Sequence, residues 1–296
     1  MATLLTPERI GRLKGLDLVA RSVVEGFITG LHRSPYHGFS VEFSEHRPYQ
    51  PGDEIRHVDW RLFARSERFH IKQYEEETNL RCHVLLDGSA SMSYASPGHL
   101  SKFEWGAALA ACLMYLMVRQ QDAAGLALFD EELRRLVPPR STRAHLRVLL
   151  KELEAWRPSG GTRTEGVLHR LAETLTRRGL VVLISDLLDE ESAVLRGLKH
   201  FRHQGHEVVV LQVLDPAELD FSRLDGGRFR DLESGAELSA DPRLVAAEVN
   251  RQVEAFVRGL RTRCHGEGID FATLSTGRAV DHALLEYLIK RKRVAG

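Results

Sequence analysis

From residue 80 onward, short apolar runs alternate with longer amphipathic segments, and this alternation limits the possible fold more than any other feature. The runs at 81–87, 123–130 and 180–189 are apolar or β-branched almost throughout, as strands buried on both faces are. Two further runs, at 206–215 and 269–276, continue the series. The segments between them have helical spacing, at 103–120, 142–156, 164–178, 192–205, about 242–265 and about 279–292. The pattern predicts an α/β fold with a doubly wound, mostly parallel sheet.

Two parts of the chain interrupt this alternation. "FRDL" and "AELS" flank a Ser-Gly turn, so we expect a β-hairpin inserted at about 217–240. Residues 1–79 predict a helix at 6–29 and then a run rich in glycine, proline and charge, in which "SVEF" and "RFHIKQYE" have the pattern of short strands. We therefore divide the chain into an N-terminal α+β region, 1–79, and an α/β domain, 80–296.

The stretch "VLLDGSASMS" at 84–93 places polar side chains at the point where the first run ends. Asp87 closes the apolar run, and Ser89 and Ser91 follow it at alternate positions. Three interpretations are open: a turn with a helix N-cap, a catalytic nucleophile with its acid, or a set of oxygen ligands for a cation.

Other polar residues are predicted to lie at the same edge of the sheet. In an open parallel sheet, ligands bind beyond the carboxyl ends of the strands, where the strand order reverses. Asp186 follows the run "VVLIS", and Thr162 lies in the loop "SGGTRTEG" before a helix. Two carboxylates about 5 Å apart would repel each other by roughly 3 kcal/mol at an effective dielectric near 20, and a divalent cation would remove that cost. An all-oxygen set suits Mg²⁺ or Mn²⁺.

The motif "DGSAS" resembles the Asp-x-Ser-x-Ser of the metal-ion-dependent adhesion site in von Willebrand factor A domains. The later threonine of "GGT" and the later aspartate after an apolar strand match as well, and the order of elements matches over about 80–292. The resemblance implies that Ser89, Ser91 and Thr162 ligate a metal ion directly or nearly so. It implies that Asp87 and Asp186 ligate the ion directly or through water.

The N-terminal run is similar to the signature of domain-of-unknown-function family 58. The matching residues are Gly30, His32, Ser34, Gly38, Glu42, Phe43, Arg47, Tyr49, Pro51, Gly52, Asp53, Arg56, Asp59, Trp60, Ala64 and Arg65. The resemblance implies a partner, because family members are often encoded beside MoxR-type AAA+ ATPases. Many members also carry membrane helices ahead of the signature, whereas we expect no direct membrane span in this chain, which begins just before it.

The charged part of the signature has two interpretations. Its arginines and acids could form ion pairs that pin this region to the sheet domain, with Trp60 and Phe63 as apolar anchors. The same side chains could instead present a surface to a partner protein. The residues of that surface would be Arg47, Tyr49, Asp53, Arg56, Asp59, Trp60 and Arg65.

Several other chemistries lack their sequence motifs. The N-terminal histidines are irregularly spaced and have no cysteine companions, which argues against zinc. "GSASM" lacks the flanking glycines of a nucleophile elbow. The chain has no Gly-x₄-Gly-Lys-[Ser/Thr] loop, so nucleotide hydrolysis would belong to a partner. Lys+Arg and Asp+Glu both number 41, so no global charge favours nucleic acid.

We therefore expect a non-enzymatic, metal-dependent protein-binding adaptor that works with a MoxR-type AAA+ ATPase in protein maturation or stress response. The ATPase or a client protein would supply an acidic side chain to the bound Mg²⁺ or Mn²⁺. Two alternatives stay open: a magnesium-dependent phosphoester hydrolase that uses the same oxygens, and a metal that only stabilises the fold. We expect a cytoplasmic location, with partner proteins as the means of recruitment to a membrane.

Overall fold

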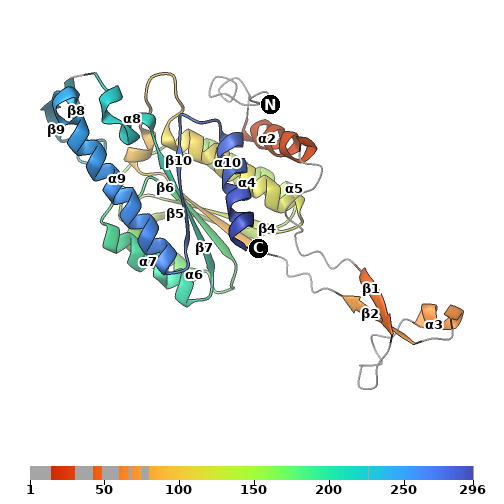
Figure 1. Ribbon diagram of the computed structural model, residues 1–296. Coiled ribbons are helices and arrows are strands. Elements are labelled where there is room, and N and C mark those ends of the chain that lie inside the picture. Colours follow the sequence, from red (N-terminus) through yellow and green to blue (C-terminus); the bar gives the residue numbers. More distant parts are fainter. Residues whose placement is uncertain are drawn as a thin grey trace. The chain divides into compact units, whose positions relative to one another are not determined.

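A six-stranded sheet forms the centre of the computed structural model, which describes residues 15–30, 43–48, 60–66, 69–74, 80–225 and 227–295 (Figure 1). Across the sheet the strands are β10 (Asp270–Ser275), β7 (Glu207–Leu214), β6 (Leu180–Ser185), β3 (Arg81–Asp87), β4 (Ala123–Phe129) and β5 (Leu133–Arg140). All neighbouring strands are parallel except β4 and β5. The predicted fold class, an α/β fold with a mostly parallel sheet, is confirmed.

Helices cover both faces of this sheet (Figure 1). On one face lie α4 (Lys102–Arg119), α2 (Leu16–Gly30), α5 (Arg143–Ala155) and α10 (Val280–Ala295), and on the other α6 (Thr164–Thr174), α7 (Glu191–His203) and α9 (Pro242–Gly266). The four inner strands are buried along almost their whole length, which is why their sequences are apolar without alternation. In α5 the predicted apolar stripe, Leu146, Leu149, Leu150 and Leu153, is buried.

The strand order reverses beside β3. From β3 the chain continues to β4 and β5 on one side, and it then returns to β6, β7 and β10 on the other side. Numbered along the chain, the order across the sheet is therefore 3-2-1-4-5-6, and the switch point lies between β3 and β6. The carboxyl ends of β3 and β6 are the place where such a sheet binds ligands.

Strand β5 is an element that the sequence pattern did not predict. Its sequence, "LRRLVPPR", contains Pro138 and Pro139, which cannot donate to a sheet ladder. The strand lies at the edge of the sheet and pairs antiparallel with β4, so the missing donors are tolerated. A Cβ at Gly125 would lie 2.8 Å from the Val137 carbonyl oxygen, so glycine permits the close approach of β4 and β5.

The predicted hairpin is confirmed. Strands β8 (Gly227–Arg230) and β9 (Glu237–Ala240) pair antiparallel, after the short helix α8 (Pro216–Leu219) and a 3₁₀ turn (Phe221–Arg223). The turn of the hairpin is organised by the Asp231 carboxylate, which accepts hydrogen bonds from the N–H groups of Glu233 and Ser234, both at 2.8 Å.

The N-terminal 79 residues contribute to two separate units. Helix α2 packs against α4 and buries Val19, Ala20, Val23 and Val24, so it belongs to the unit that contains the sheet. The second unit, Tyr36–Leu80, contains β1 (Phe43–Pro48), α3 (Trp60–Ser66) and β2 (His70–Tyr74). Strands β1 and β2 pair antiparallel. Of the predicted strand "SVEF", Phe43 lies in β1, and residues 40–42 lie outside the described residues.

Among the described residues, no helix is long and apolar enough to cross a membrane.

Candidate metal centre

The two aspartates predicted at the edge of the sheet lie on neighbouring strands. Asp87 is the last residue of β3, and Asp186 directly follows Ser185, the last residue of β6. The two strands are parallel, with Leu86 paired to Ile184, so they end at the same level. Both aspartates are fully buried. The strand register thus brings the two predicted acids to the switch point.

Asp87 is held by neutral donors. Its Oδ1 accepts a hydrogen bond from the Ser89 N–H at 2.9 Å, and its Oδ2 accepts one from the Ser185 hydroxyl at 2.6 Å. Burial raises the pKa of Asp87 to about 7, and the negative charge of Asp186 adds to this shift, although the hydrogen bonds from the serines oppose it. At neutral pH the ionised form of Asp87 is therefore costly unless a cation lies beside it.

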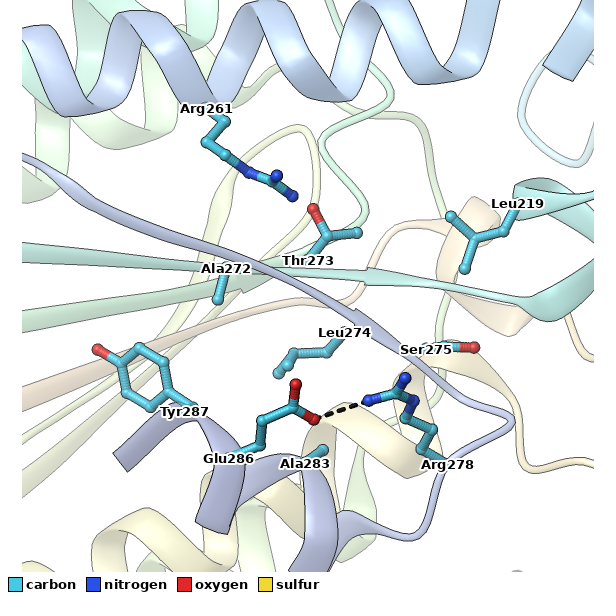
Figure 2. A pocket seen from close by; sticks show the side chains of 10 residues that line it. All are labelled: Leu219, Arg261, Ala272, Thr273, Leu274, Ser275, Arg278, Ala283, Glu286 and Tyr287. Atoms are coloured by element: carbon cyan, nitrogen blue, oxygen red, sulfur yellow. Dashed lines mark hydrogen bonds and ion pairs between the residues drawn. The ribbon is translucent and has the colours of Figure 1, made fainter. Parts of the chain in front are cut away.

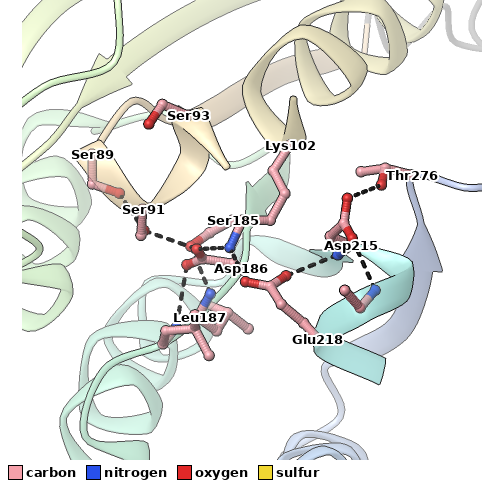
Figure 3. A network of polar contacts seen from close by, with 12 residues as sticks. Ser89, Ser91, Ser93, Lys102, Ser185, Asp186, Leu187, Asp215, Glu218 and Thr276 are labelled. Carbon is pink, nitrogen blue, oxygen red and sulfur yellow. Dashed lines mark hydrogen bonds and ion pairs between the residues drawn. The ribbon is translucent and has the colours of Figure 1, made fainter. Parts of the chain in front are cut away.

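Three oxygen atoms near Asp87 have the spacing of a metal-ion ligand shell. Ser89 Oγ lies 3.1 Å from Ser91 Oγ, and the Ser91 hydroxyl donates to Asp186 Oδ2 at 2.8 Å (Figure 3). Neighbouring ligands of an octahedral Mg²⁺ ion lie about 2.9 Å apart, because each Mg–O distance is about 2.0–2.1 Å. Such separations are also ordinary for hydrogen-bonded oxygens, so what favours Mg²⁺ or Mn²⁺ is the donor set, which consists of oxygen atoms alone. Within the described residues no three His, Cys, Asp or Glu side chains form a metal-binding group, so a cation here would depend on the hydroxyls.

Helix capping does not explain the hydroxyls of Ser89 and Ser91. Ser89 precedes a 3₁₀ turn, Ala90–Ser93, but its side chain makes no capping hydrogen bond. Helix α4 is capped instead by Ser101, whose hydroxyl accepts a hydrogen bond from the Glu104 N–H at 3.1 Å. The hydroxyls of Ser89 and Ser91 thus face each other and Asp186 rather than a helix terminus.

The fifth predicted ligand, Thr162, lies in a loop attached to the Asp-x-Ser-x-Ser segment. The Ser159 N–H donates to the Gly88 carbonyl at 3.0 Å, and the Ala90 N–H donates to the Gly160 carbonyl at 2.9 Å. The Thr162 hydroxyl, however, donates to a carboxylate oxygen of Glu233 at 2.7 Å, and its N–H donates to the other oxygen at 3.1 Å. Glu233 belongs to the turn of the inserted hairpin, and sequence reasoning did not identify it.

A second residue missed in the sequence is Lys102, the first residue of α4. It is fully buried, and its Nζ donates to Asp186 Oδ2 at 2.7 Å and to Glu218 Oε1 at 2.5 Å (Figure 3). Burial lowers the pKa of Lys102, but the charges of Asp186 and Glu218 outweigh that effect and raise it above its ordinary value. Burial raises the pKa of Glu218, and Lys102 opposes the shift. The sequence signal that could have identified Lys102 is a lysine at the start of a helix that is apolar over most of its length.

The polar network continues to the end of β7. The second carboxylate oxygen of Glu218 accepts a hydrogen bond from the Asp215 N–H at 2.8 Å. The buried Asp215 carboxylate in turn accepts hydrogen bonds from the N–H groups of Ser96 and Ala217 and from the hydroxyls of Ser96 and Thr276. Four buried or largely buried acids therefore lie along this edge of the sheet, at Asp87, Asp186, Asp215 and Glu218.

Gly88 sets the path of the Asp-x-Ser-x-Ser segment. A Cβ at this position would lie 2.1 Å from Trp156 Nε1 and 2.6 Å from Trp156 Cε2. No real Cβ atom tolerates such distances, so glycine allows the indole ring to cover the turn that follows Asp87.

The residues of the predicted partner surface belong to the second unit. Trp60 is 56% exposed and packs edge-on against Phe63 and Phe69, with ring centroids 6.1 and 6.4 Å away, and Arg65 is exposed. Arg47 lies in β1. Tyr49, Asp53, Arg56 and Asp59 lie outside the described residues.

Comparisons with known proteins identify the family. Residues 45–256 match the family described as "Protein of unknown function DUF58", and the chain belongs to this family. The uncharacterized protein Rv1480 of Mycobacterium tuberculosis is 28% identical over 98% of this chain and 92% of its own length. The uncharacterized protein Mb1516 of Mycobacterium bovis matches to the same extent.

Several solved structures align with part of this chain. Protein BatB from Bacteroides thetaiotaomicron has 16% identity and a TM-score of 0.49, with 72% of this chain and 99% of that chain covered. The vWF domain of the type V pili tip protein Mfa5 from Porphyromonas gingivalis has 15% identity and a TM-score of 0.38, with 71% and 94% covered. Similarity at this level says nothing about what the present chain binds.

Proposed function

We propose that this member of the DUF58 family is a non-enzymatic protein-binding module whose binding depends on one divalent cation, Mg²⁺ or Mn²⁺. The observation that carries the proposal is the cluster of oxygens from Ser89, Ser91 and Asp186 beside the buried Asp87. When bound, the cation would supply a Lewis-acidic centre that accepts an acidic side chain from another protein. The partner class, a MoxR-type AAA+ ATPase or its client, follows from the resemblance of the N-terminal signature.

The residues around the oxygens would control how strongly a cation is held. Two aspartates balance the charge of a divalent ion, while serine hydroxyls are weak ligands that leave it able to accept another oxygen. Lys102 lies 2.7 Å from Asp186 Oδ2 and would repel the cation, which favours moderate rather than tight metal binding. The Thr162 hydroxyl already donates a hydrogen bond to Glu233 in the inserted hairpin. A partner's carboxylate that approaches this hydroxyl would therefore compete with Glu233.

The hydrolase alternative receives less support from the geometry. Asp87 has a pKa near 7, as a general base requires, but its side chain is fully buried and its hydrogen-bond partners are serines. The described hydrogen-bond partners of the Asp186 carboxylate are Ser91, Lys102 and the Leu188 N–H. Neither aspartate is therefore placed to contact the reacting atoms of a substrate.

The metal site is tested by calorimetric titration and thermal unfolding of the full chain with Mg²⁺, Mn²⁺ or a chelator. At a hundredfold excess over the dissociation constant, the cation should stabilise the fold by about 2.7 kcal/mol. That corresponds to a rise in Tm of several degrees at about 2–4 °C per kcal/mol. The double variant Ser89→Ala/Ser91→Ala and the variant Asp87→Ala should not respond.

Ser93→Ala is the matched control for the serine variants, because the Ser93 hydroxyl lies in the same turn and donates to the Ala90 carbonyl instead. This variant should respond to the cation as the native chain does. If the native chain shows no heat of binding and no change in Tm with either cation, the metal centre is wrong.

The partner is tested with a purified MoxR-type ATPase from the same organism. Variants of this chain are preferable to a chelator, because the ATPase itself needs Mg²⁺ for nucleotide. Ser89→Ala/Ser91→Ala should weaken binding about 30-fold or more, equivalent to about 2 kcal/mol, and Ser93→Ala should not. Double-mutant cycles between Thr162→Ala and substitutions of the partner's exposed Asp and Glu residues, one at a time, would locate the carboxylate that binds the cation. Equal binding by all variants would place the interface elsewhere, with the Arg47–Arg65 surface as the next candidate.

A further inference from the structure

The two edges of the sheet differ in how they are protected against pairing with another strand. Edge strand β5 carries Pro138, Pro139 and three arginines, the kinds of residue that block edge-to-edge pairing. The opposite edge strand, β10, has the sequence "DFATLS", which contains no proline, lysine or arginine. Strand β10 is therefore chemically able to accept a further strand.

The free side of β10 carries backbone groups that lack a partner in the sheet. The Thr276 N–H, at the end of the ladder, donates to the Leu214 carbonyl of β7 at 3.0 Å. Because successive residues of a strand direct their N–H and C=O groups to opposite sides, Thr273 and Ser275, both partly exposed, direct theirs away from β7, as does the fully buried Phe271. Within the described residues no strand pairs with that side of β10.

A groove with a volume of about 330 Å³ runs along this edge (Figure 2). Helix α9 forms one wall and supplies Arg261, and α10 forms the other wall and supplies Tyr287. The floor contains side chains from both faces of β10: Thr273 points toward α9, and Leu274 points toward α10. The groove therefore spans the strand edge itself rather than one face of the sheet.

The charge of the groove selects the kind of occupant. Arg278 forms an ion pair with Glu286 at 2.7 Å, but Arg261 has no carboxylate partner among the described residues. The Arg261 guanidinium extends over Thr273, near the middle of the strand (Figure 2). An extended segment paired with β10 would place its own side chains beside this free positive charge.

We propose that β10 and its groove form a binding site for an extended peptide segment of another protein, which adds to the sheet as a seventh strand and places an acidic side chain against Arg261. Backbone hydrogen bonds to Thr273 and to the Ser275 N–H would provide affinity, and Arg261 would provide selectivity. A second copy of this chain fits less well, because twofold pairing of β10 with β10 would bring two unpaired Arg261 side chains together. None of the residues that line the groove is a candidate metal ligand, although Gln212 links the Thr273 hydroxyl to the Asp186 carbonyl.

The probe is a displayed library of short random peptides, selected against the full chain and against two variants. Thr273→Pro removes an N–H that faces away from β7, so the sheet keeps its ladder while the edge loses a donor. It also removes the hydroxyl that donates to Gln212 Oε1 at 3.2 Å, and Thr273→Val, which loses the hydroxyl but keeps the N–H, is the control for that loss and should bind normally. Arg261→Gln removes the charge alone. Arg258→Gln is the matched control, because Arg258 is exposed on the same helix but does not line the groove.

Peptides enriched on the native chain should carry an acidic residue at one fixed position. Thr273→Pro should weaken their binding about 30-fold or more, and Arg261→Gln should weaken it about tenfold. After that acid is replaced by its amide, Arg261→Gln should have no further effect. Binding should also slow amide hydrogen exchange at Thr273, and Arg258→Gln should bind normally.

Three results would overturn the proposal. The first is a selection in which no peptide is enriched more strongly on the native chain than on the Thr273→Pro variant. The second is enriched peptides that bind both variants with native affinity. The third is a dimer in solution that Thr273→Pro dissociates, which would identify the occupant as a second copy of the chain.

Discussion

Replacing Asp87 by asparagine tests whether the ionised Asp87 carboxylate destabilises the metal-free protein, in which no bound cation compensates its charge. The pKa of Asp87 rises from its ordinary value of 3.8 to about 7, mainly through burial. At about 1.36 kcal/mol per pH unit, the difference between these two values means that ionised Asp87 costs the fold up to about 4 kcal/mol relative to the neutral acid. Asparagine resembles the neutral acid, so Asp87→Asn should stabilise the metal-free protein by up to that amount at about pH 8.

The pH dependence of this difference has a definite sign. Because the folded-state pKa of Asp87 lies above the unfolded-state value, the stabilisation from the neutral acid is fully present below about pH 4 and is lost as the pH rises through about 7. Native protein and Asp87→Asn should therefore be equally stable near pH 4 and should separate progressively up to pH 8. Because the two proteins differ at one side chain, the comparison removes the contribution of groups far from Asp87.

A bound cation should reverse the comparison, because it stabilises the ionised carboxylate. Saturating Mg²⁺ at about pH 8 should stabilise the native chain and leave Asp87→Asn unchanged. The assay is urea unfolding at several pH values, with chelator or with Mg²⁺, and Asp225→Asn on the exposed surface is the control. The reasoning is refuted if Asp87→Asn is less stable than the native chain at pH 8 in chelator. A full Mg²⁺ response in Asp87→Asn would place the metal elsewhere.

Three further predictions concern Lys102, Gly88 and Thr162. Lys102→Met leaves the carboxylates of Asp186 and Glu218 without their ammonium partner. In chelator, urea unfolding should show a free energy of unfolding lower by about 3–5 kcal/mol. Calorimetry should show a higher affinity for Mg²⁺, because the positive charge beside Asp186 is gone. Lys199→Met, at a half-exposed ion pair, should cost less than about 1 kcal/mol. Gly88→Ala drives a methyl group into the Trp156 indole and should destabilise by about 1–3 kcal/mol, and Trp156→Leu should relieve most of that loss in the double variant. Thr162→Ala should weaken Mg²⁺ binding about tenfold in calorimetry if its hydroxyl ligates the ion, and an unchanged affinity would remove it from the ligand set.

The sheet could be predicted because burial on both faces leaves a direct trace in the sequence. Strands such as β6, "LVVLIS", are apolar at every position since helices cover both sides. Strand β5 leaves no such trace, because an edge strand tolerates proline and charge, and "LRRLVPPR" has the composition of a loop. The packing of α2 against α4 was also beyond prediction, since a helical pattern shows which face is apolar but not which surface covers it.

The candidate site was predictable to the extent that strand ends determine it. Asp87 and Asp186 directly follow buried strands, so their meeting follows from strand order alone. Lys102 was missed because a lysine at the start of a helix ordinarily points to water, and only the close approach of α4 to α8 buries its ammonium group. Glu233 was missed because the position of a hairpin turn relative to a distant loop has no local sequence signal.

Charge balance along this edge indicates which group would respond to a cation. The Asp215 carboxylate is satisfied by amide and hydroxyl donors, and Lys102 lies between Asp186 and Glu218 and compensates one of their two negative charges. Among the described residues, Asp87 receives hydrogen bonds from serines alone, so none of them brings a positive charge into contact with it. Near pH 7 a proton and a divalent cation would therefore compete for the same excess of negative charge. Since a proton on Asp87 displaces the cation, a partner bound through that cation should dissociate as the pH falls below about 7, with the Lys102 pair intact.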